Sequence, residues 1–442
     1  MIFTGYDIDT PVDVDCINQE SQNNAANNVV YGDGVRFCSY MKSVAGKKQI
    51  FVGVSRDEGE TWDIEQVTSS AYDHYESSCA IDVPGTGLHL VYAAKGYGST
   101  EIRRANTSII YNYRYPDGSW RGEWTIIGGG PVHYADAWHP CIAIDSSDNV
   151  HLACIWGINY SSYFGYTLPA GTYRRFNAAG GVVSGVGDRH EFRYGYHATQ
   201  CMLNKPNIQV DSYGNPQITY IIKKPRADFG ADCFTSVWIA NFQQGHIDGW
   251  PGTRYPGIPT YCVGYLNDAP NAHVLCDKDK RTGVGTVPNY PSYYARMALS
   301  HNYDEGAYDY PHCVFSFVGY GIYPGGTYYT WKDGTGWHDE VIALNSPPDS
   351  PSIAIGADGV LHSVVEDVIG ASFGYRQKAS PAEAWSAKTV ISSVNYPRQL
   401  SQLLYAPFPL TGAPCSPFMA VEGTTLKYFK CESFSRGYGF FM

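Results

Sequence analysis

Residues 139–156 read HPCIAIDSSDNVHLACIW, two short apolar runs that flank a polar turn, and this pattern recurs along the chain. In each run apolar residues alternate with small or polar ones, which is typical of a half-buried β-strand. The Asp, Ser, Asn and Gly residues between the runs form turns, so each copy predicts a β-hairpin. Clear copies are KPNIQVDSYGNPQITYII at 205–222, SPSIAIGADGVLHSVVE at 350–366 and SSCAIDVPGTGLHLVY at 77–92.

Three looser copies lie at 29–40, at 296–317 and within 401–431. Successive turns are separated by about 50 to 90 residues, enough for four strands and their loops. Repeats of this kind, arranged around an axis, make a β-propeller of four-stranded blades, in which few strand edges are exposed. The sequence therefore predicts one all-β domain over 1–442, a seven-bladed propeller, with six or eight blades as the alternatives.

The composition agrees with an all-β fold and excludes several other classes. The 442 residues include 47 Gly and 37 Tyr but only 17% charged residues, a poor composition for helices. No apolar run is long enough to span a membrane as a helix. The net charge of −11 argues against a nucleic-acid partner held by a basic field.

Neither the cysteines nor the acidic residues form a recognisable metal motif. The 12 Cys contain no CxxC pair, and several lie in apolar runs, as expected for buried free thiols. There is no HExxH or EF-hand loop, so no cofactor is expected beyond a structural calcium ion, for which the acidic turn at 277–279 is a candidate. The first residues, MIFTGYDIDT, show no signal peptide.

A second motif follows the hairpins. Residues 55–62, SRDEGETW, match the pattern SxDxGxTW at every fixed position, and 115–120 (YPDGSW) and 331–337 (WKDGTGW) match it in part. Asp and Gly favour a tight turn, here expected between the two outer strands of a blade, and Trp packs into the blade. Over nearly its whole length the chain resembles the Asp-box (BNR repeat) sialidase-like propellers, in which these boxes are structural.

This resemblance implies that each innermost strand starts at the ligand-binding face. The loops before the first strand and after the second strand of each blade would then surround the binding site. Residues expected before first strands are Asp73, His74, Glu76, Tyr134, Asp136, Trp138, His139, Tyr196, His197, Lys205, Tyr293, Tyr294 and Arg296. Residues expected after second strands are Lys95, Asn159, Tyr160, Lys223, Lys224, Arg226, Glu366 and Asp367.

The expected binding face combines cations with aromatic residues. Clustered cations attract an anionic ligand even in an acidic protein, and aromatic rings stack on sugars. An acidic glycan in an extracellular setting, or at a virion or cell surface, is therefore the expected ligand, with ordinary solvated loop charges as the alternative. The expected substrate-binding residues are Trp138, Lys95, His197, Lys223, Lys224, Arg226 and Tyr160.

For chemistry at this face, the sequence favours a polysaccharide lyase, which needs a base and a cation that holds the uronate carboxylate. A distant resemblance to BNR-type propeller lyases, including those acting on ulvan, implies a His just ahead of an innermost strand. His74 and His139 match, but the second His of those lyases is replaced by Lys95 and by residues 157–159. The expected base is His139 or Tyr196, with His74 as a further candidate.

The carboxylate would be held by Arg296 together with Lys223 or Lys224. Hydrolysis of a sialidase type requires three arginines, for which Arg36, Arg296 and Arg398 are candidates. However, Arg36 lies in the sequence VRFC rather than Arg-Ile-Pro, and a packing role is favoured for it. A third alternative is a propeller without catalysis, which binds a glycan or receptor, as in a phage or viral adhesion protein or a surface appendage.

Overall fold

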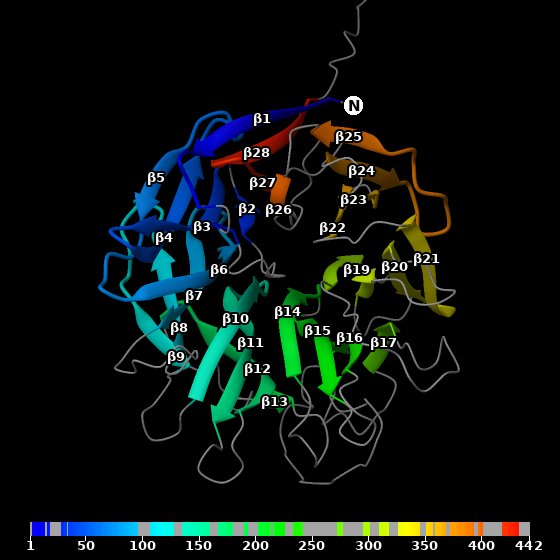
Figure 1. Ribbon diagram of the computed structural model, residues 1–442, viewed down its shortest axis with the longest axis horizontal. Helices are drawn as coiled ribbons and strands as arrows, with labels where there is room; N and C mark the ends of the chain where they lie inside the picture. The colour runs from blue at the N-terminus through cyan, green and yellow to red at the C-terminus, as the bar shows by residue number, and fades with distance from the viewer. Residues whose placement is uncertain are drawn as a thin grey trace, which may run out of the picture.

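Seven four-stranded antiparallel sheets are arranged around a common axis (Figure 1). The computed structural model describes residues 2–13, 16–17, 28–32, 34–95, 107–127, 135–159, 167–179, 190–192, 202–212, 214, 216–225, 233–241, 272–276, 295–300, 309–317, 326–344, 351–356, 359–367, 372–392, 397–400 and 418–432. Within these ranges all regular structure is β-strand. The predicted all-β propeller is confirmed, and the seven sheets match the seven predicted hairpins.

We number the sheets as blades, each listed from its innermost strand outward. Blade 1 holds β2 (Val29–Tyr31), β3 (Arg36–Val44), β4 (Lys47–Ser55) and β5 (Asp63–Gln66). Blade 2 holds β6 (Asp73–Ile81), β7 (Leu88–Lys95), β8 (Thr107–Arg114) and β9 (Trp124–Ile127). Blade 3 holds β10 (Ala135–Ile144), β11 (Asn149–Asn159), β12 (Thr167–Asn177) and β13 (His190–Phe192). Blade 4 holds β14 (Met202–Val210), β15 (Pro216–Pro225), β16 (Cys233–Asn241) and β17 (Ala272–Cys276).

Blade 5 holds β18 (Ala295–Ser300), β19 (Tyr310–Phe317), β20 (Gly326–Asp333) and β21 (Gly336–Leu344). Blade 6 holds β22 (Ser352–Ile355), β23 (Leu361–Asp367), β24 (Ser372–Lys378) and β25 (Thr389–Ser392). Blade 7 holds β26 (Pro397–Leu400), β27 (Phe418–Glu422), β28 (Thr425–Glu432) and β1 (Ile2–Asp9). Each hairpin repeat therefore supplies the first and second strands of a blade, although the last one starts earlier than expected, at Pro397.

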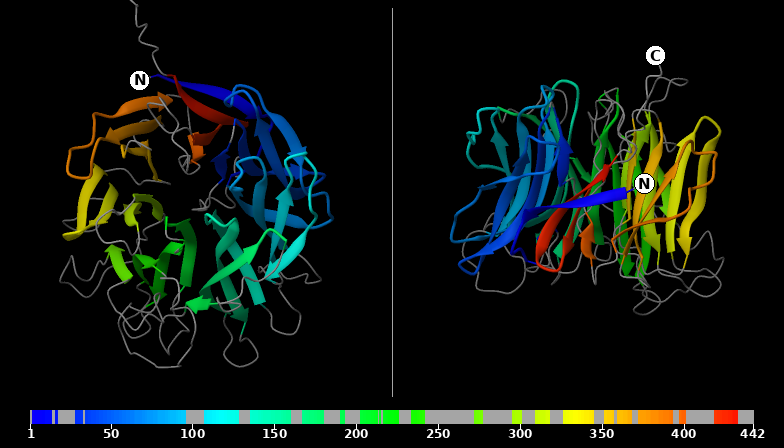
Figure 2. Two further views of the ribbon diagram at one scale, coloured as in Figure 1. Left: turned by 180° about the vertical axis from the view of Figure 1, so that it is seen from behind. Right: turned by 90° about the horizontal axis from the view of Figure 1, so that it is seen from above.

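Blade 7 closes the ring with strands from both ends of the described chain. Strand β1 pairs antiparallel with β28, from Ile2 opposite Glu432 to Asp9 opposite Leu426. The two strands lie side by side at the rim in two views of the molecule (Figures 1 and 2). Because β1 is the outer strand of a sheet whose other strands are C-terminal, it joins blade 7 to blade 1, and the row of blades becomes a ring.

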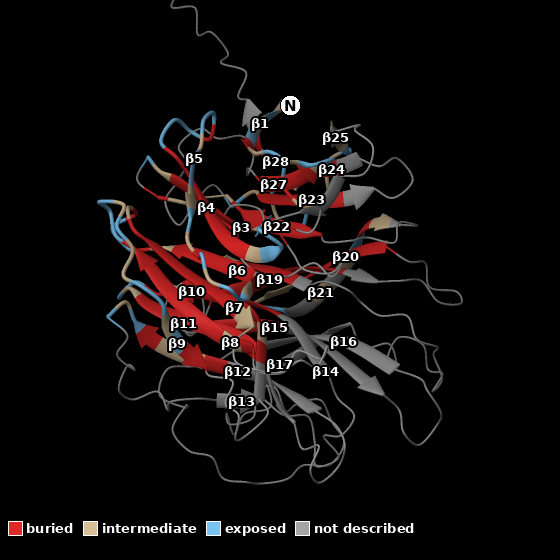
Figure 3. Cartoon of the chain, turned by 60° about the vertical axis from the view of Figure 1, so that its left-hand side comes forward, coloured by how far each residue is buried: buried red, intermediate tan, exposed pale blue. Residues whose placement is uncertain are grey.

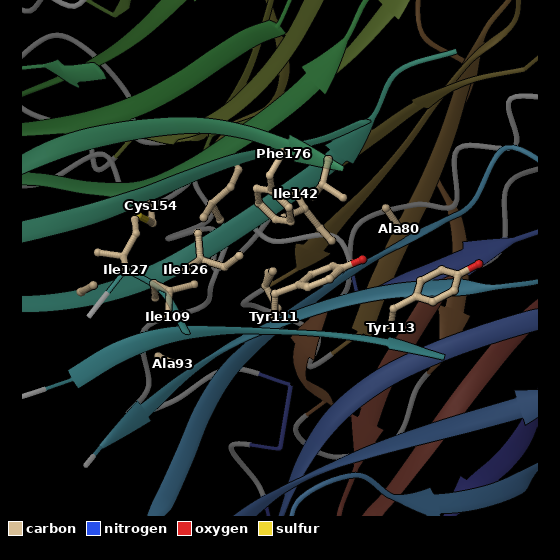
Figure 4. Packing of buried hydrophobic residues seen from close by; sticks show 14 residues of the cluster. Ala80, Ala93, Ile109, Tyr111, Tyr113, Ile126, Ile127, Ile142, Cys154 and Phe176 are labelled. Carbon is tan, nitrogen blue, oxygen red and sulfur yellow. The ribbon is translucent and has the colours of Figure 1, made fainter. Parts of the chain in front are cut away.

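The apolar core is divided among the interfaces between neighbouring blades, where the buried strand residues lie (Figure 3). Between blades 2 and 3, Tyr111 of β8 meets Phe176 of β12 edge-on, with ring centroids 5.0 Å apart, and Ile142 of β10 belongs to the same cluster (Figure 4). Both faces of a blade are thus covered by its neighbours, so alternating apolar residues on either face contribute to stability.

The inner strands are also tied to one another by polar contacts. The side chain of Asn28 donates to the carbonyl oxygen of Ser77, at 2.6 Å, which links blade 1 to blade 2. Ser78 Oγ accepts from the N–H of Ile142 at 3.2 Å, which links blade 2 to blade 3. Asn207 Oδ1 accepts from the N–H of Met297 at 3.0 Å and links blade 4 to blade 5. These bonds fix the inner strands relative to each other.

The turn at 55–62 joins β4 to β5, the two outer strands of blade 1, as expected. Asp57 Oδ1 accepts from Ser55 Oγ and from the N–H of Thr61, both at 2.9 Å. Gly59 adopts φ 89°, and Trp62 Nε1 donates to the Gly59 carbonyl oxygen at 3.0 Å. The partial match at 115–120 lies between β8 and β9, and the one at 331–337 spans the end of β20, the turn and the start of β21, the same connection in blades 2 and 5.

Four blades bury a histidine of the second strand against a tyrosine of the third strand. The Nδ1 atom contacts the tyrosine hydroxyl in His89–Tyr111 (2.9 Å), His151–Tyr173 (2.9 Å), His312–Tyr329 (2.6 Å) and His362–Tyr375. Burial lowers the pKa of His151, and it lowers the pKa of His312 to about 3. His151 and His312 are therefore neutral parts of the core.

Two further findings concern the described residues as a whole. They include no helix long and apolar enough to cross a membrane. Six cysteines within the described ranges are buried free thiols: Cys16, Cys38, Cys79, Cys141, Cys154 and Cys313. Burial raises the pKa of Cys79 to about 12, so its thiol is protonated and unreactive.

Candidate functional site

The inner strands of blades 2, 3 and 4 each contain a β-bulge at the same level. The register shifts by one extra residue between Tyr75 and Ser78, between Trp138 and Cys141, and between Asn204 and Asn207. The first residue of each bulge is Glu76, His139 and Lys205, respectively. A bulge re-aims a side chain and is common beside functional sites.

The bulges also explain where the predicted site residues lie. Residues 73–76 and 136–139 were expected in loops ahead of the inner strands, but they lie inside β6 and β10. The reason is that each strand continues pairing with its neighbour on both sides of the bulge. Glu76 and His139 are therefore bulge residues with paired backbone on both sides rather than residues of free loops, which fixes their positions more tightly.

Glu76 and His139 have an unusual backbone conformation for residues within strands. Their φ angles are 54° and 51°. Among the described residues, the other non-glycine positions with positive φ are Ala45, Glu58 and Asp148, and all three lie in turns between strands. The left-handed conformation costs a non-glycine residue roughly 1–2 kcal/mol, and it persists where the surroundings hold it in place.

Glu76 and His139 contact each other across the interface between blades 2 and 3. The backbone N–H of His139 donates to Glu76 Oε2 at 2.7 Å. His139 Nδ1 lies 3.0 Å from Glu76 Oε1, and the two side chains are only 2% and 4% exposed. The N–H of Glu76 in turn donates to Met41 Sδ of blade 1 at 3.3 Å. One carboxylate thus accepts a hydrogen bond from the backbone of the histidine and lies at ion-pair distance from its ring.

This arrangement determines how the imidazole of His139 can act. With Nδ1 against a carboxylate, the favoured neutral tautomer carries its proton on Nδ1. The lone pair is then on Nε2, where the ring can accept a proton, and the carboxylate stabilises the imidazolium that forms. The pair has the components of a general base with its orienting group.

His74, the second predicted histidine, has different neighbours. Its Nε2 lies 3.9 Å from Glu123 Oε1, and its ring meets Tyr92 edge-on at 5.6 Å. Tyr92 OH donates to the same Glu123 oxygen at 2.8 Å. Burial is the main cause that lowers the pKa of His74, which favours the neutral ring. Tyr92 packs with blade 1 residues such as Met41, so His74 belongs to the interface of blades 1 and 2.

The other described candidates are placed as follows. Trp138, next to His139, is half-buried, and so is Lys95, which ends β7 with its backbone paired to Asp73. Arg296 of β18 is fully buried. It precedes Met297, whose N–H donates to Asn207 of the neighbouring inner strand. Trp138 precedes His139 on the same inner strand, whereas Arg296 lies two blades further round the ring.

The remaining candidates are only partly described. Lys223 and Lys224 lie near the end of β15. The backbone of Lys223 is opposite Met202 on one side and Thr235 on the other, and the backbone of Lys224 is opposite Phe234. Four site candidates lie outside the described residues: Tyr160, Tyr196, His197 and Arg226. The acidic turn at 277–279 also lies outside them. Within the described ranges, no group of three or more His, Cys, Asp or Glu side chains could hold a metal ion.

Arg36 is a packing residue. It opens β3 opposite Tyr31, the last residue of inner strand β2, whereas Glu76 and His139 lie toward the starts of their inner strands. Its guanidinium lies 4.9 Å from the centre of the Tyr31 ring and 6.0 Å from that of Tyr428. Arg36 is therefore at the other end of the blades from the candidate site, as expected for a structural arginine.

Sequence reasoning named Glu76 on the binding face but gave it no role. The signal was present in the repeats, because HPCIAID and ESSCAID align without a gap and place Glu76 at the position of His139. The copy KPNIQVD adds Lys205 at the same position. What the alignment does not contain is the left-handed backbone that turns the first two residues toward each other.

The comparisons with known proteins establish the fold. No protein-family model and no curated protein matches the sequence. An ulvan lyase of polysaccharide lyase family PL25 superposes with a TM-score of 0.61 at 10% identity, covering 96% of this chain and 95% of that one. A PL25 ulvan lyase structure bound to -[GlcA(1-4)Rha3S]- matches to the same extent. Polysaccharide lyase Uly1 matches with a TM-score of 0.54 at 9% identity, covering 91% and 88%. The chain is thus similar in fold, over nearly its whole length, to propellers that process polysaccharides.

Proposed function

We propose that this protein is a polysaccharide lyase that cleaves an extracellular acidic glycan by β-elimination next to a uronate. The observation that carries the proposal is the buried pair of His139 and Glu76, held in left-handed backbone at two inner-strand bulges. The similarity in fold to ulvan lyases, one of them bound to a glucuronate-containing oligosaccharide, supports it.

In the proposed reaction, His139 Nε2 takes the proton from C5 of the uronate. The electron pair of the C5–H bond forms the C4–C5 double bond while the C4–O bond breaks, and the leaving oxygen receives a proton from Tyr196 or from the new imidazolium. The small exposed fraction of His139 is compatible with this role, because only one nitrogen of the ring, Nε2, has to reach the substrate. Exclusion of water strengthens its interaction with Glu76.

A cation is needed because neutralising the uronate carboxylate makes the C5 proton more acidic. We assign this contact to Lys223 or Lys224, near the end of the second strand of blade 4. Lys95 lies at the corresponding end of the second strand of blade 2. Arg296 is fully buried, so it would act through its charge rather than by contact. Trp138, and in the proposal Tyr160, His197 and Arg226, would bind the sugar rings and their charged groups.

Three further features belong to the same proposal. The turn at 55–62, with its Asp57 hydrogen bonds, supports descent from the Asp-box sialidase-like propellers. An acidic polysaccharide places the protein outside the cell, or at a virion or cell surface. The elimination uses protein side chains and requires no cofactor, with calcium considered as a structural ion.

The test is to incubate the protein with a panel of uronate polysaccharides and to follow the ultraviolet absorbance of the 4,5-unsaturated product. We expect a rise with at least one polymer and a loss of about 100-fold or more in the His139→Ala variant. His338→Gln, near the start of the outermost strand β21 of blade 5, is the matched control and keeps wild-type activity. Glycan binding without product would overturn the lyase and favour the binding protein, and new reducing ends without absorbance would favour hydrolysis.

A further inference from the structure

We infer that Glu76 is a positioning residue that acts from blade 2 on His139 of blade 3, fixing which ring nitrogen faces the substrate. The inference rests on the proposed function and goes beyond it, because it assigns a role to a residue that does not touch the sugar. It also makes the interface between two blades part of the active site.

Both carboxylate oxygens of Glu76 lie close to one partner, His139. Oε2 accepts the backbone N–H of His139 at 2.7 Å, and this bond alone would hold the bulge. Oε1 lies 3.0 Å from Nδ1 of the same residue, at ion-pair distance rather than in a hydrogen bond, so its charge also acts on the ring.

The backbone around Glu76 is fixed on both sides. Its N–H is bound to Met41 Sδ of blade 1, and the Ser77 carbonyl oxygen accepts from Asn28 of blade 1. Ser78 Oγ accepts from the N–H of Ile142 in blade 3. Three consecutive residues are thus anchored to neighbouring blades, so the carboxylate is set by blade packing, as a preorganised site requires.

The charge of Glu76 also acts on the His139 ring. Within the described part of the chain, the ionisable group in contact with the His139 ring is Glu76 of β6. The described residues at the corresponding level of β14 are Pro206 and Asn207, which carry no charge, and Lys205 occupies the bulge position of that strand. The carboxylate therefore stabilises the imidazolium formed when His139 accepts the proton.

The kinetic test compares wild type with Glu76→Gln and Glu76→Asp. Loss of the negative charge destabilises the imidazolium, so in Glu76→Gln we expect kcat to fall about 10- to 100-fold with little change in KM. The acidic limb of the kcat/KM profile should move to lower pH. Glu76→Asp, which restores the charge, should recover part of kcat and the position of that limb. An unchanged pH profile in Glu76→Gln would overturn the inference.

The matched control is Glu422→Gln, which removes a largely buried carboxylate, 9% exposed and paired with Lys427 at 3.1 Å in blade 7. It should lower the melting temperature without moving the pH profile. If Glu76→Gln changes only the melting temperature in the same way, Glu76 is structural and the inference is wrong.

A second measurement does not depend on activity. In protein labelled with ¹⁵N-histidine, the His139 signals, assigned by their loss in His139→Ala, should show the Nδ1–H tautomer at a pH where the ring is neutral. Glu76→Ala should shift the ring toward the Nε2–H tautomer. An Nε2–H tautomer in the wild type would overturn the inference even if the protein is a lyase. If the wild type shows the Nδ1–H tautomer but cleaves no polymer, the positioning of His139 by Glu76 stands and the proposed reaction is refuted.

Discussion

The indole of Trp62 packs edge-on against the ring of Tyr428, with ring centroids 5.3 Å apart and an interplanar angle of 60°. Trp62 ends the turn at 55–62 of blade 1, and Tyr428 lies on β28 of blade 7. Lys430 of the same strand pairs with Glu58 at 2.9 Å and with Glu60 at 3.3 Å. The turn therefore has a role beyond its own blade, because it fastens blade 1 to the blade that closes the ring.

Gly59 is the position where this contact is most sensitive. Its φ of 89° disfavours any side chain, and a Cβ atom there would lie 2.3 Å from Tyr428 Cε1. We expect Gly59→Ala to lower the free energy of unfolding by about 2–4 kcal/mol, as backbone strain adds to overpacking. Gly46→Ala, at φ 76° with nothing within 4 Å, should cost only about 1 kcal/mol. Urea denaturation measures both, and equal losses would contradict the role of the Tyr428 contact.

Lys378 provides a second test of an interface, that between blades 5 and 6. Its buried ammonium pairs with Glu340 and lies 5.0 Å from the ring centre of Trp331 and 5.6 Å from that of Trp385. Glu340→Gln leaves this charge without its partner and should cost about 3 kcal/mol. Lys378→Met should cost less, since the Glu340 side chain is 30% exposed and can be solvated.

The double variant should recover most of the loss. Both residues would then be uncharged, and Met fills much of the volume of the lysine stem. A double-mutant cycle of urea unfolding measures this coupling. Additive losses would show that the ion pair does not determine the stability of this interface.

Acid should destabilise the protein through its buried histidines. His312 has its pKa lowered to about 3 by burial, with the charge of Lys378 as a further cause. An unfolded histidine titrates near 6.5, so between about pH 6.5 and 3 the unfolded chain binds the extra proton. The stability is therefore complete above this window and is lost as the pH falls, by about 1 kcal/mol per pH unit for this group.

His312→Gln tests this directly. The variant should be less stable at neutral pH, because the contact with Tyr329 changes, but its stability should fall less steeply with acid. Unfolding midpoints measured across this pH range give the two slopes. Parallel curves would mean that His312 is protonated equally in both states.

Because β1 closes the ring by pairing with β28, we expect that the strand can be deleted and then replaced by a synthetic peptide of the same sequence. Deleting residues 1–9 exposes the edge of β28, so we expect a lower melting temperature and concentration-dependent association. A synthetic peptide of residues 2–9 should restore monomer and melting temperature, and a scrambled peptide should not. Unchanged stability after the deletion would show that β1 is not needed to close the ring.

Much of the fold could be predicted because the blade hairpins are local. Copies such as 139–156 carry their own alternation and turn residues, and they became adjacent strands, here β10 and β11. The pairing of β1 with β28 was not predicted, since nothing in IFTGYDID indicates a partner at the far end of the sequence. Strand β26 was placed too late because its copy is weak and its second strand begins only at Phe418.

The candidate site could be predicted only in part. His139 was found because its repeat is strong, and Trp138 because it is adjacent. The role of Glu76 depends on a bulge and on φ angles of 54° and 51°, which arise from packing between blades rather than from residue type. Arg296 shows the converse, since a charged residue expected on the surface is fully buried in the structure.

The closure by β1 also has a consequence for biosynthesis. Thr10, just beyond β1, contacts Thr424, 414 residues later in the chain. During translation β1 has left the ribosome long before β28 exists, and it must wait while the intervening blades are made. Pairings this distant in sequence form slowly, and an unpaired strand edge invites association with other chains. The last step of folding is thus the one most exposed to error, and a nascent chain that stalls before residue 425 would remain an open arc.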